Sequence, residues 1–465
     1  MGSFHLKTYN FLMENLFLPL FDISRGTSRF KCSRILRKTQ WYDRRNLERL
    51  QKNNLRLLIK HAYDTVPYYN KIFRERGLYP SDIRNVEDLV KLPILTKTAV
   101  RKNIRALVSR SYPAKKLIRY TSGGSGDQLR FYITKDQLSW EVAAEYRAYE
   151  WAGSRRGDSC FLFWGSPIDM SKRKSIQWQL GMNLERTHII DTFALSNEAL
   201  SRSASLLELH NPSVIRGYSS SIYLMAKYLI ENGIKSVRPR TVLTTAEALS
   251  SHMRETIEEA FGCSVFDFYG SREIGSLAAE CKEHSGYHIS AENVAIEFVN
   301  SGEHVAAGEK GAVLLTSLRN FGMPFIRYQI GDVAVPSGDS CGCGRGLPLM
   351  QQIEGRISDF LALYDNRLDR IIPVGPVYII LNNAMIHVPL QSVRIYQENL
   401  NSFLINAVKD KAFSDKDADR LITFLRSYLG QSVNIKIEFV DYLPPAPSGK
   451  RPTFISKINP FEQSG

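Results

Sequence analysis

From Arg119 onwards, short runs of β-forming residues alternate with helical stretches along the chain. Leu129–Thr134 precedes the helical stretch Lys135–Trp151, and the apolar run Val265–Tyr269 follows the helical stretch Ser251–Phe261. Such alternation is typical of layered α/β folds with a largely parallel sheet. We therefore predict an α/β fold whose functional residues gather just beyond the carboxyl ends of the strands.

The length of the chain requires more than one hydrophobic core. Its 465 residues exceed the roughly 250–300 residues at which a single core stops growing. Near Gly355 the pattern changes, and strand-like runs then flank a helical stretch around Ala418–Leu429. We predict a large multi-sheet N-terminal domain, residues 1–357, and a small mobile α+β C-terminal lid domain, residues 358–465.

The charge and the cysteine content narrow the classes of partner and the compartment. The formal net charge is +14, from 61 basic and 47 acidic side chains, which favours acidic partners such as nucleotides, coenzyme A, anionic polysaccharide or a phospholipid surface. Because basic and aromatic residues do not cluster in one motif, we expect no nucleic-acid partner. Six cysteines in 465 residues are too few for a disulfide-stapled secreted scaffold, so we expect reduced thiols and a cytoplasmic protein.

The apolar segment Phe4–Phe21 has two interpretations. It contains Lys7, Glu14 and Pro19, so its uncharged runs are too short for the ~20 residues of a membrane span, and it lacks the pattern of a secretory signal. It forms either a helix packed on the domain or an interfacial helix at the inner face of the membrane. The basic residues that follow, from Arg25 onwards, favour membrane contact.

A glycine-rich loop follows the apolar run Leu117–Tyr120. It consists of Thr121, Ser122, Gly123, Gly124, Ser125 and Gly126. Glycines let the backbone approach a polyphosphate closely, and consecutive amides form an anion-binding nest. No Gly-Lys-Ser/Thr follows, so the loop is not a Walker motif. The alternative interpretation is an ordinary Ser/Gly hairpin turn.

Four further sites carry residues suited to nucleotide chemistry, although each is compatible with an ordinary turn or linker. Tyr269 and Gly270 end an apolar strand, and Glu273 follows them with a carboxylate able to hold Mg²⁺. Asp332 follows a glycine, as acidic residues that bind a ribose diol do. Arg356 lies at the composition boundary, and Lys450 lies in a Pro/Ser/Gly-rich loop.

Taken in order, these sites resemble the core motifs of adenylate-forming enzymes, a superfamily of acyl-CoA synthetases, peptide-synthetase adenylation domains and luciferases. Thr245-Ala246-Glu247 stands where that series expects a further motif. More narrowly, the chain resembles the phenylacetate–CoA ligase branch and its capsular-polysaccharide relatives. This likeness extends over nearly the whole chain and includes Gln40-Trp41, Val66-Pro67-Tyr68-Tyr69 and the segment Gly322–Tyr328.

The resemblance implies a role for each motif. The loop from Thr121 to Gly126 would bind the ATP phosphates, and Glu273 would hold Mg²⁺. Asp332 would bind the ribose hydroxyls with Arg356 beside it, and Lys450 would reach from the C-terminal lid to the reacting carboxylate and α-phosphate. The residues expected around the adenine are Ala246, Glu247, Tyr269 and Gly270.

The same comparison implies a structural zinc site. Cys281, His288 and the pair Cys341 and Cys343 resemble a Cys, His, Cys-x-Cys set found in some members of the branch. Three thiolates and one imidazole complete a tetrahedral zinc site and leave no position for water. His284 is a rival ligand to His288, and scattered reduced cysteines are the alternative to any metal site.

The sequence therefore predicts an ATP- and Mg²⁺-dependent ligase that converts a carboxylic acid into an acyl-AMP with release of pyrophosphate. The C-terminal domain would then rotate about Ser358–Asp359, and coenzyme A would accept the acyl group. One alternative acceptor is an amine in capsule or surface-polysaccharide synthesis. A second alternative is a non-catalytic nucleotide- or membrane-binding assembly protein, because Gly124 and Asp127 depart from the usual phosphate loop.

Overall fold

A computed structural model of the chain forms two compact units. It describes residues 2–112, 117–121, 129–165, 176–192, 197–300, 302–356, 360–365, 370–376, 388–429, 433–444 and 453–456. The larger unit comprises Met1–Ile330 and Ala334–Ile353, and the smaller comprises Gly331–Val333 and Glu354–Gly465. The predicted boundary between residues 357 and 358 stays a prediction, because residues 357–359 lie outside the described ranges.

Helices form the first hundred residues of the larger unit. Residues Gln40–Arg76 contain two helices separated by Val66. Pro67 occupies the first turn of the second helix, where its missing N–H costs nothing. The elements are α1 (Gly2–Leu12), η1 (Met13–Phe17), α2 (Leu18–Arg25), α3 (Arg29–Thr39), α4 (Arg44–Thr65), α5 (Pro67–Glu75), η2 (Pro80–Asp82), η3 (Glu87–Lys91) and α6 (Lys97–Lys102).

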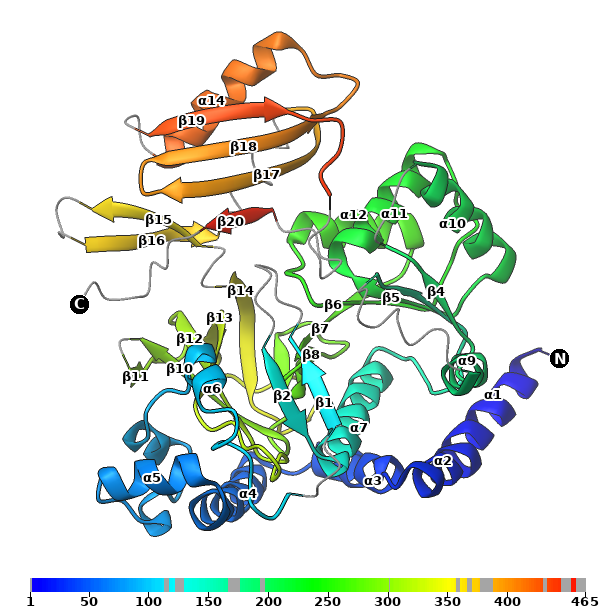
Figure 1. Ribbon diagram of the computed structural model, residues 1–465. Helices are drawn as coiled ribbons and strands as arrows, with labels where there is room; N and C mark the ends of the chain where they lie inside the picture. The colour runs from blue at the N-terminus through cyan, green and yellow to red at the C-terminus, as the bar shows by residue number, and fades with distance from the viewer. Residues whose placement is uncertain are drawn as a thin grey trace. The chain divides into compact units, whose positions relative to one another are not determined.

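A 12-stranded sheet, in the order β11-β10-β12-β13-β14-β9-β8-β7-β6-β5-β3-β4, runs through the larger unit (Figure 1). The pairs β3–β4, β3–β5, β5–β6 and β6–β7 are parallel, whereas β7–β8, β8–β9, β9–β14 and β10–β12 are antiparallel. The strands are β3 (Cys160–Phe163), β4 (Thr187–Ile190), β5 (Val214–Tyr218), β6 (Thr241–Thr245), β7 (Val265–Ser271), β8 (Gly275–Glu280), β9 (Tyr287–Ile289), β10 (Val294–Asn300), β11 (Glu303–His304), β12 (Gly311–Ser317), β13 (Tyr328–Pro336) and β14 (Leu349–Arg356).

The prediction of an α/β fold is confirmed, but the parallel part of the sheet is smaller than expected. Only the strands between Cys160 and Ser271 are separated by helices long enough for parallel crossovers. The later strands follow one another through short connections and therefore pair antiparallel. The helices are α7 (Lys135–Trp151), α9 (Ile176–Leu184), α10 (Asn197–His210), α11 (Ser219–Glu231) and α12 (Ser251–Phe261).

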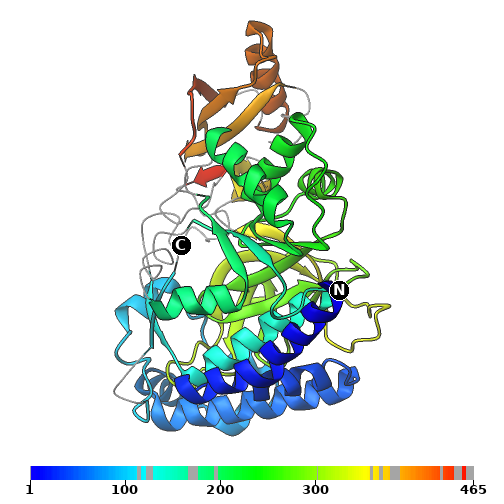
Figure 2. The same ribbon diagram turned by 90° about the vertical axis from the view of Figure 1, so that its right-hand side faces the viewer.

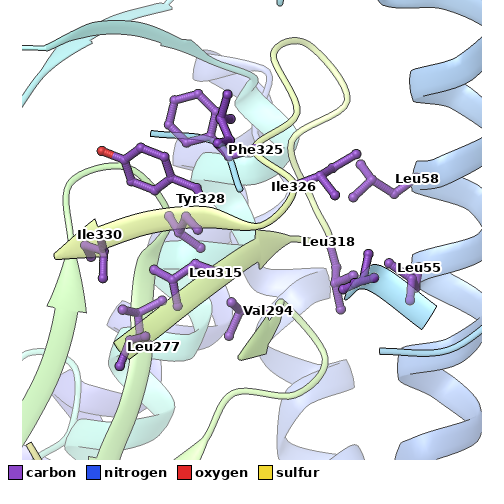
Figure 3. Close-up of a cluster of buried hydrophobic side chains, with 14 of the residues drawn as sticks. Leu55, Leu58, Leu277, Val294, Leu315, Leu318, Phe325, Ile326, Tyr328 and Ile330 are labelled. Atoms are coloured by element: carbon purple, nitrogen blue, oxygen red, sulfur yellow. The ribbon is translucent and has the colours of Figure 1, made fainter. Parts of the chain in front are cut away.

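Two cores support the sheet. The first packs α4 and α5 against the antiparallel strands and includes the stacked rings of Phe325 and Tyr328, whose centroids lie 4.7 Å apart (Figure 3). The second packs α10, α11 and α12 against the parallel strands, with Ile222 and Val242 fully buried. A small antiparallel hairpin, β1 (Leu117–Tyr120) with β2 (Arg130–Ile133), completes the larger unit.

The smaller unit contains a four-stranded sheet in the order β19-β18-β17-β20. Its core includes Ile395 and Phe403 from the sheet and Leu421 from the helix. The strand-helix-strand order predicted from sequence is confirmed. The elements are β15 (Phe360–Asp365), β16 (Arg370–Pro376), β17 (Leu390–Asn399), β18 (Ser402–Lys409), α14 (Asp415–Leu429), β19 (Asn434–Phe439) and β20 (Phe454–Ser456).

Within the described residues, no helix combines the length and the apolar character that crossing a membrane requires.

Candidate functional site

Thr121 closes the β1–β2 hairpin from which the glycine-rich loop emerges. Its backbone N–H donates to the Leu129 carbonyl at 3.0 Å, and its hydroxyl accepts from the Leu129 N–H at 2.9 Å. Because the Thr121 hydroxyl oxygen accepts this hydrogen bond, its hydroxyl hydrogen is still available to donate. The rest of the predicted phosphate loop, Ser122, Gly123, Gly124, Ser125 and Gly126, lies outside the described residues.

The turn after β6 contains a strained residue and a helix cap. Ala246 has a φ of 70°, in the left-handed region that costs a residue with a Cβ about 1–3 kcal/mol. The next residue, Glu247, accepts from the Ser220 N–H through Oε2 at 3.0 Å, and its carbonyl accepts from the Ser219 hydroxyl at 3.2 Å. Its carboxylate therefore caps the first turn of α11, where negative charge is favourable.

Tyr269 and Gly270 lie at the end of β7, where it leaves the parallel part of the sheet. The pairing with β8 shifts between these two residues, so the strand bends at this point. Tyr269 is buried and belongs to the core of the antiparallel strands. Stacking of its ring on a base stays a prediction.

Glu273 is buried in the turn between β7 and β8, and two side chains fix it from opposite elements. Tyr328 donates from its hydroxyl to Glu273 Oε1 at 2.9 Å. Gln137, on α7, donates from Nε2 to the Glu273 carbonyl at 3.0 Å. The carboxylate predicted to hold Mg²⁺ is thus restrained through Oε1, and its backbone is restrained through the carbonyl, as hydrogen bonds to metal-binding carboxylates typically do.

A second buried carboxylate, Glu141, lies beside this turn and was not predicted from the sequence. Its Oε1 accepts from the same Gln137 Nε2 at 2.7 Å, and its Oε2 pairs with an N–H of Arg119 at 2.7 Å. That arginine, on β1, also donates to the Arg272 carbonyl at 3.3 Å. Glu141 therefore links the hairpin of the glycine-rich loop to the turn that carries Glu273.

Burial raises the pKa of Glu141 to about 7, against the opposing effects of Arg119 and Gln137. Gly275 makes room for this side chain: a Cβ at that position would lie 2.3 Å from Glu141 Cγ, and its φ is +93°. The only signal in the sequence was the four-residue spacing of Gln137 and Glu141 on one helix face.

Aromatic side chains cluster at the carboxyl ends of β3 and β5. The rings of Trp164 and Tyr218 stack with centroids 4.4 Å apart. The Arg216 guanidinium lies 4.8 Å from the Tyr149 ring centroid and 3.6 Å from a carboxylate oxygen of Glu145. These strand ends are where ligands bind in open α/β sheets.

The remaining predicted nucleotide-binding residues belong to the smaller unit. Asp332 is buried on β13, directly after Gly331, which has a φ of +91°. Arg356 ends β14. Lys450 and the expected hinge Ser358–Asp359 lie outside the described residues. Convergence of these groups with Glu273 on one nucleotide therefore stays a prediction.

The four predicted zinc ligands come together in the larger unit. Their ligand atoms all lie within 4.8 Å of one another, with Cys281 Sγ 3.6 Å from Cys341 Sγ and Cys343 Sγ 3.3 Å from His288 Nε2. Zn–S bonds of about 2.3 Å in a tetrahedron put sulfur atoms about 3.8 Å apart, close to the observed separation. The donor set is therefore suited to a closed zinc site.

The rival ligand His284 points to other partners. Its Nδ1 lies 3.4 Å from Glu280 Oε2, and its ring lies 4.7 Å from that of Phe266. His288 is fully buried on β9, opposite Leu349 of β14, and this register carries it to the cysteine loop. All six cysteines of the chain are free of disulfide bonds.

The fold is that of adenylate-forming CoA ligases. The crystal structure of 2-hydroxyisobutyryl-CoA ligase in the postadenylation state with R3-HIB-AMP superposes with a TM-score of 0.70 and 19% identity, over 88% of this chain and 89% of that one. The same ligase in an open conformation with 2-HIB-AMP and CoA superposes with a TM-score of 0.58 and 18% identity, over 88% and 91% of the two chains.

Proteins similar in sequence indicate which branch of these ligases the chain resembles. Protein CapK of Staphylococcus aureus is 24% identical over 428 residues, 89% of this chain and 90% of CapK. The phenylacetate-coenzyme A ligases of Thermus thermophilus and Escherichia coli are 26% and 27% identical, over 69% and 68% of this chain and 72% of each ligase. Residues 377–457 match the CapK C-terminal domain. The predicted resemblance to the phenylacetate–CoA ligase branch and its capsule relatives is confirmed, and these relatives support an AMP-forming acid ligase.

Proposed function

We propose that the chain uses ATP and Mg²⁺ to convert a carboxylic acid into an acyl-AMP and then transfers the acyl group to coenzyme A. The observation that carries this proposal is the fixed, buried carboxylate of Glu273. Tyr328 binds one oxygen of this carboxylate, Gln137 binds the backbone carbonyl of the same residue, and the Gln137–Glu141–Arg119 contacts connect its turn to the β1–β2 hairpin. A preoriented carboxylate is suited to a metal-bound polyphosphate.

In the first step, a carboxylate oxygen of the acid attacks the α-phosphorus of ATP. The bond from that phosphorus to the oxygen bridging the β-phosphate breaks, and pyrophosphate leaves. When bound at Glu273, Mg²⁺ would neutralise phosphate charge. Lys450 would offset the negative charge that grows on the attacking and α-phosphate oxygens, an effect typically of about 3–4 kcal/mol. Asp332 and Arg356 would hold the ribose.

In the second step, the thiolate of coenzyme A attacks the acyl carbon, the bond to AMP breaks, and AMP leaves. Rotation of the C-terminal domain about Ser358–Asp359 would exchange Lys450 for the acceptor site. The adenylate and CoA complexes of 2-hydroxyisobutyryl-CoA ligase, which has this fold, support both steps. The Trp164–Tyr218 stack suggests a flat aromatic acid as a first substrate to try.

A second acceptor is favoured by one observation. The match to CapK extends over 89% of the chain, whereas the matches to phenylacetate-coenzyme A ligases extend over 68–69%. Residues 377–457, which match the CapK C-terminal domain, belong to the smaller unit. That unit would contribute to binding the acceptor. The alternative product is therefore an amide, formed with an amine of a capsule or surface polysaccharide precursor.

We also propose that Cys281, His288, Cys341 and Cys343 hold a structural Zn²⁺. The support is the mutual approach of their ligand atoms and the burial of three of the four side chains. The site would tie the end of β8 to β9 and the loop before β14. A cytoplasmic location also stays part of this proposal.

The test is a pyrophosphate-release assay with a panel of aliphatic and aromatic acids, run with Mg²⁺ and with coenzyme A, an amine panel or neither acceptor. Release that depends on an acid supports adenylation, and formation of a thioester or an amide identifies the acceptor. Lys450→Ala should lower the rate of adenylation by about 10²–10³ with little change in the Kd of ATP. The control is Lys436→Ala, at an exposed lysine paired with Glu438 in the same unit.

ATP binding without pyrophosphate release from any acid, and with no effect of Lys450→Ala, would contradict the proposed reaction. It would favour the non-catalytic assembly protein instead.

A further inference from the structure

One side of the N-terminal helix is anchored to the larger unit. The elements α1, η1 and α2 follow one another with helical backbone angles at both junctions, so residues 2–25 form one continuous helix. Asn10 donates to the buried Asp158 carboxylate at 2.8 Å, and Tyr9 donates to the Leu184 carbonyl at 2.6 Å. Met13 and Leu18 are each 2% exposed. These contacts fix which face of the helix points outward.

The outward face carries a stripe of large apolar side chains. Leu12, Leu16, Leu20 and Ile23 are spaced by four, four and three residues, which puts them on one helix face. They are 37%, 48%, 53% and 80% exposed, and the neighbouring Phe11 is 64% exposed. Figures 1 and 2 both show this dark-blue helix on the outside of the larger unit. Among the described residues, no buried core cluster includes a side chain of this stripe.

The segment that carries the stripe is rich in positive charge. Residues 1–40 contain two acidic side chains, Glu14 and Asp22. Both are paired within the fold, Glu14 with Arg37 and Asp22 with Arg29. Five other basic side chains of this segment are exposed: Lys7, Arg25, Lys31, Arg34 and Lys38.

We propose that the N-terminal segment, through the Leu12–Ile23 stripe and the exposed basic side chains of residues 1–40, docks on an anionic lipid membrane. An anionic bilayer offers negative headgroups over an apolar interior, which complements an apolar stripe in a segment rich in cations. A symmetric contact with a second copy would use the same patch twice and bring the five cations of each copy together. The inference concerns a surface apart from the nucleotide site and does not depend on the proposed reaction.

The test measures co-sedimentation of the full chain with vesicles of phosphatidylcholine alone or with added phosphatidylglycerol. We expect binding to the anionic vesicles that weakens as salt is raised, because each surface cation contributes about a fivefold gain in affinity that salt screens. The triple variant Leu16→Glu, Leu20→Glu, Ile23→Glu should reduce binding at least tenfold. The matched control also introduces three glutamates, with the same change in net charge, at exposed leucines on α4 and α10: Leu57→Glu, Leu206→Glu and Leu209→Glu.

The control variant should bind as the unaltered chain does. Lys31→Glu combined with Arg34→Glu should remove the preference for anionic over zwitterionic vesicles. Circular dichroism and thermal unfolding should be the same for all variants, since every altered side chain is exposed.

The proposal is overturned if the chain binds neither vesicle, or if both triple variants lose binding equally. It is also overturned if the chain is a dimer in solution and the stripe variant alone becomes a monomer, because the occupant would then be a second copy. Acid-dependent pyrophosphate release can be measured in the same preparations, so failure of membrane binding is distinguishable from failure of the proposed reaction.

Discussion

The phenol of Tyr328 donates a 2.9 Å hydrogen bond to Oε1 of Glu273, and both side chains are buried. Fifty-five residues of sequence separate the two. The bond joins the first residue of β13 to the turn after β7, so the orientation of the predicted magnesium ligand depends on the packing of the antiparallel strands.

Tyr328→Phe removes this donor and leaves the ring in place. A hydrogen bond to a charged group contributes about 1.5–3 kcal/mol, so we expect the affinity for Mg·ATP to fall about tenfold or more. Isothermal titration calorimetry measures the change. The control is Tyr69→Phe, whose buried hydroxyl donates to the Pro324 carbonyl at 3.0 Å. It should lower stability and leave nucleotide affinity unchanged; equal losses of affinity in the two variants would contradict the role of Tyr328.

The raised pKa of Glu141 predicts a specific dependence of stability on pH. In the folded chain this pKa is about 7, against 4.5 for an ordinary glutamate. Between these values the folded chain keeps a proton that the unfolded chain loses, so stability is fully present below pH 4.5 and falls as pH rises to about 7. The charged and titratable groups facing Glu141 are Arg119 and Glu145.

Glu141→Gln removes this titration. Relative to the variant, the unaltered chain should lose up to about 3 kcal/mol across the window, from ~1.4 kcal/mol per pKa unit. Urea denaturation below and above the window measures the difference. Glu48→Gln, at an exposed glutamate paired with Arg44, should show no such trend. A constant difference between the unaltered chain and Glu141→Gln at all pH values would refute the shift.

The ion pair between Arg147 and Glu292 should be a major determinant of stability. The side chains are 1% and 0% exposed and lie 2.7 Å apart, with Thr39 donating to the same carboxylate oxygen. Arg147→Met leaves the carboxylate buried without its cation, which typically costs about 3–5 kcal/mol. Arg147→Met combined with Glu292→Gln should cost clearly less. Denaturant titrations give both values.

The comparison for this pair is Arg44→Met, which breaks an exposed pair with Glu48 and should cost under about 1 kcal/mol. Comparable losses of unfolding free energy in Arg147→Met and Arg44→Met would show that burial does not determine how much an ion pair contributes to stability.

Elemental analysis tests the metal site. We expect about one zinc per chain when four ligands close the site. Cys343→Ser and His288→Ala should lower the zinc content and the thermal stability together, because structural zinc contributes to folding. His284→Ala should retain the metal, since its ring contacts Phe266 and Glu280 instead. Loss of zinc in His284→Ala but not in His288→Ala would reverse the ligand assignment.

Several features could be predicted from the sequence because they depend on neighbouring residues. The alternation of strands and helices indicated the α/β class, and the helix around Ala418–Leu429 is the observed α14, Asp415–Leu429. The order of the motifs along the chain indicated the superfamily. Each motif can be recognised because it is a short run of residues whose turn conformation depends on its neighbours in sequence. The extent of the parallel sheet was overestimated, because the described residues between Ser271 and Leu349 form strands without the intervening helices that parallel crossovers require.

Other features depended on contacts between distant residues. The resemblance favoured His288 over its rival His284 as the zinc ligand, but the pairing of β9 with β14 is what brings His288 to Cys343. The residues adjacent to Glu141 in sequence do not distinguish it from the exposed glutamates. Its burial beside Gly275 raises its pKa, against the opposing effect of Arg119.

The sequence by itself determined the class of fold, the motifs and the apolar spacing of the N-terminal helix. Tertiary structure decided which side of that helix is packed and which is left in solvent, which histidine meets the thiols and which carboxylates are buried. The physical reason is that secondary structure follows from local backbone and side-chain preferences, whereas burial and long-range pairing follow from how the finished elements pack.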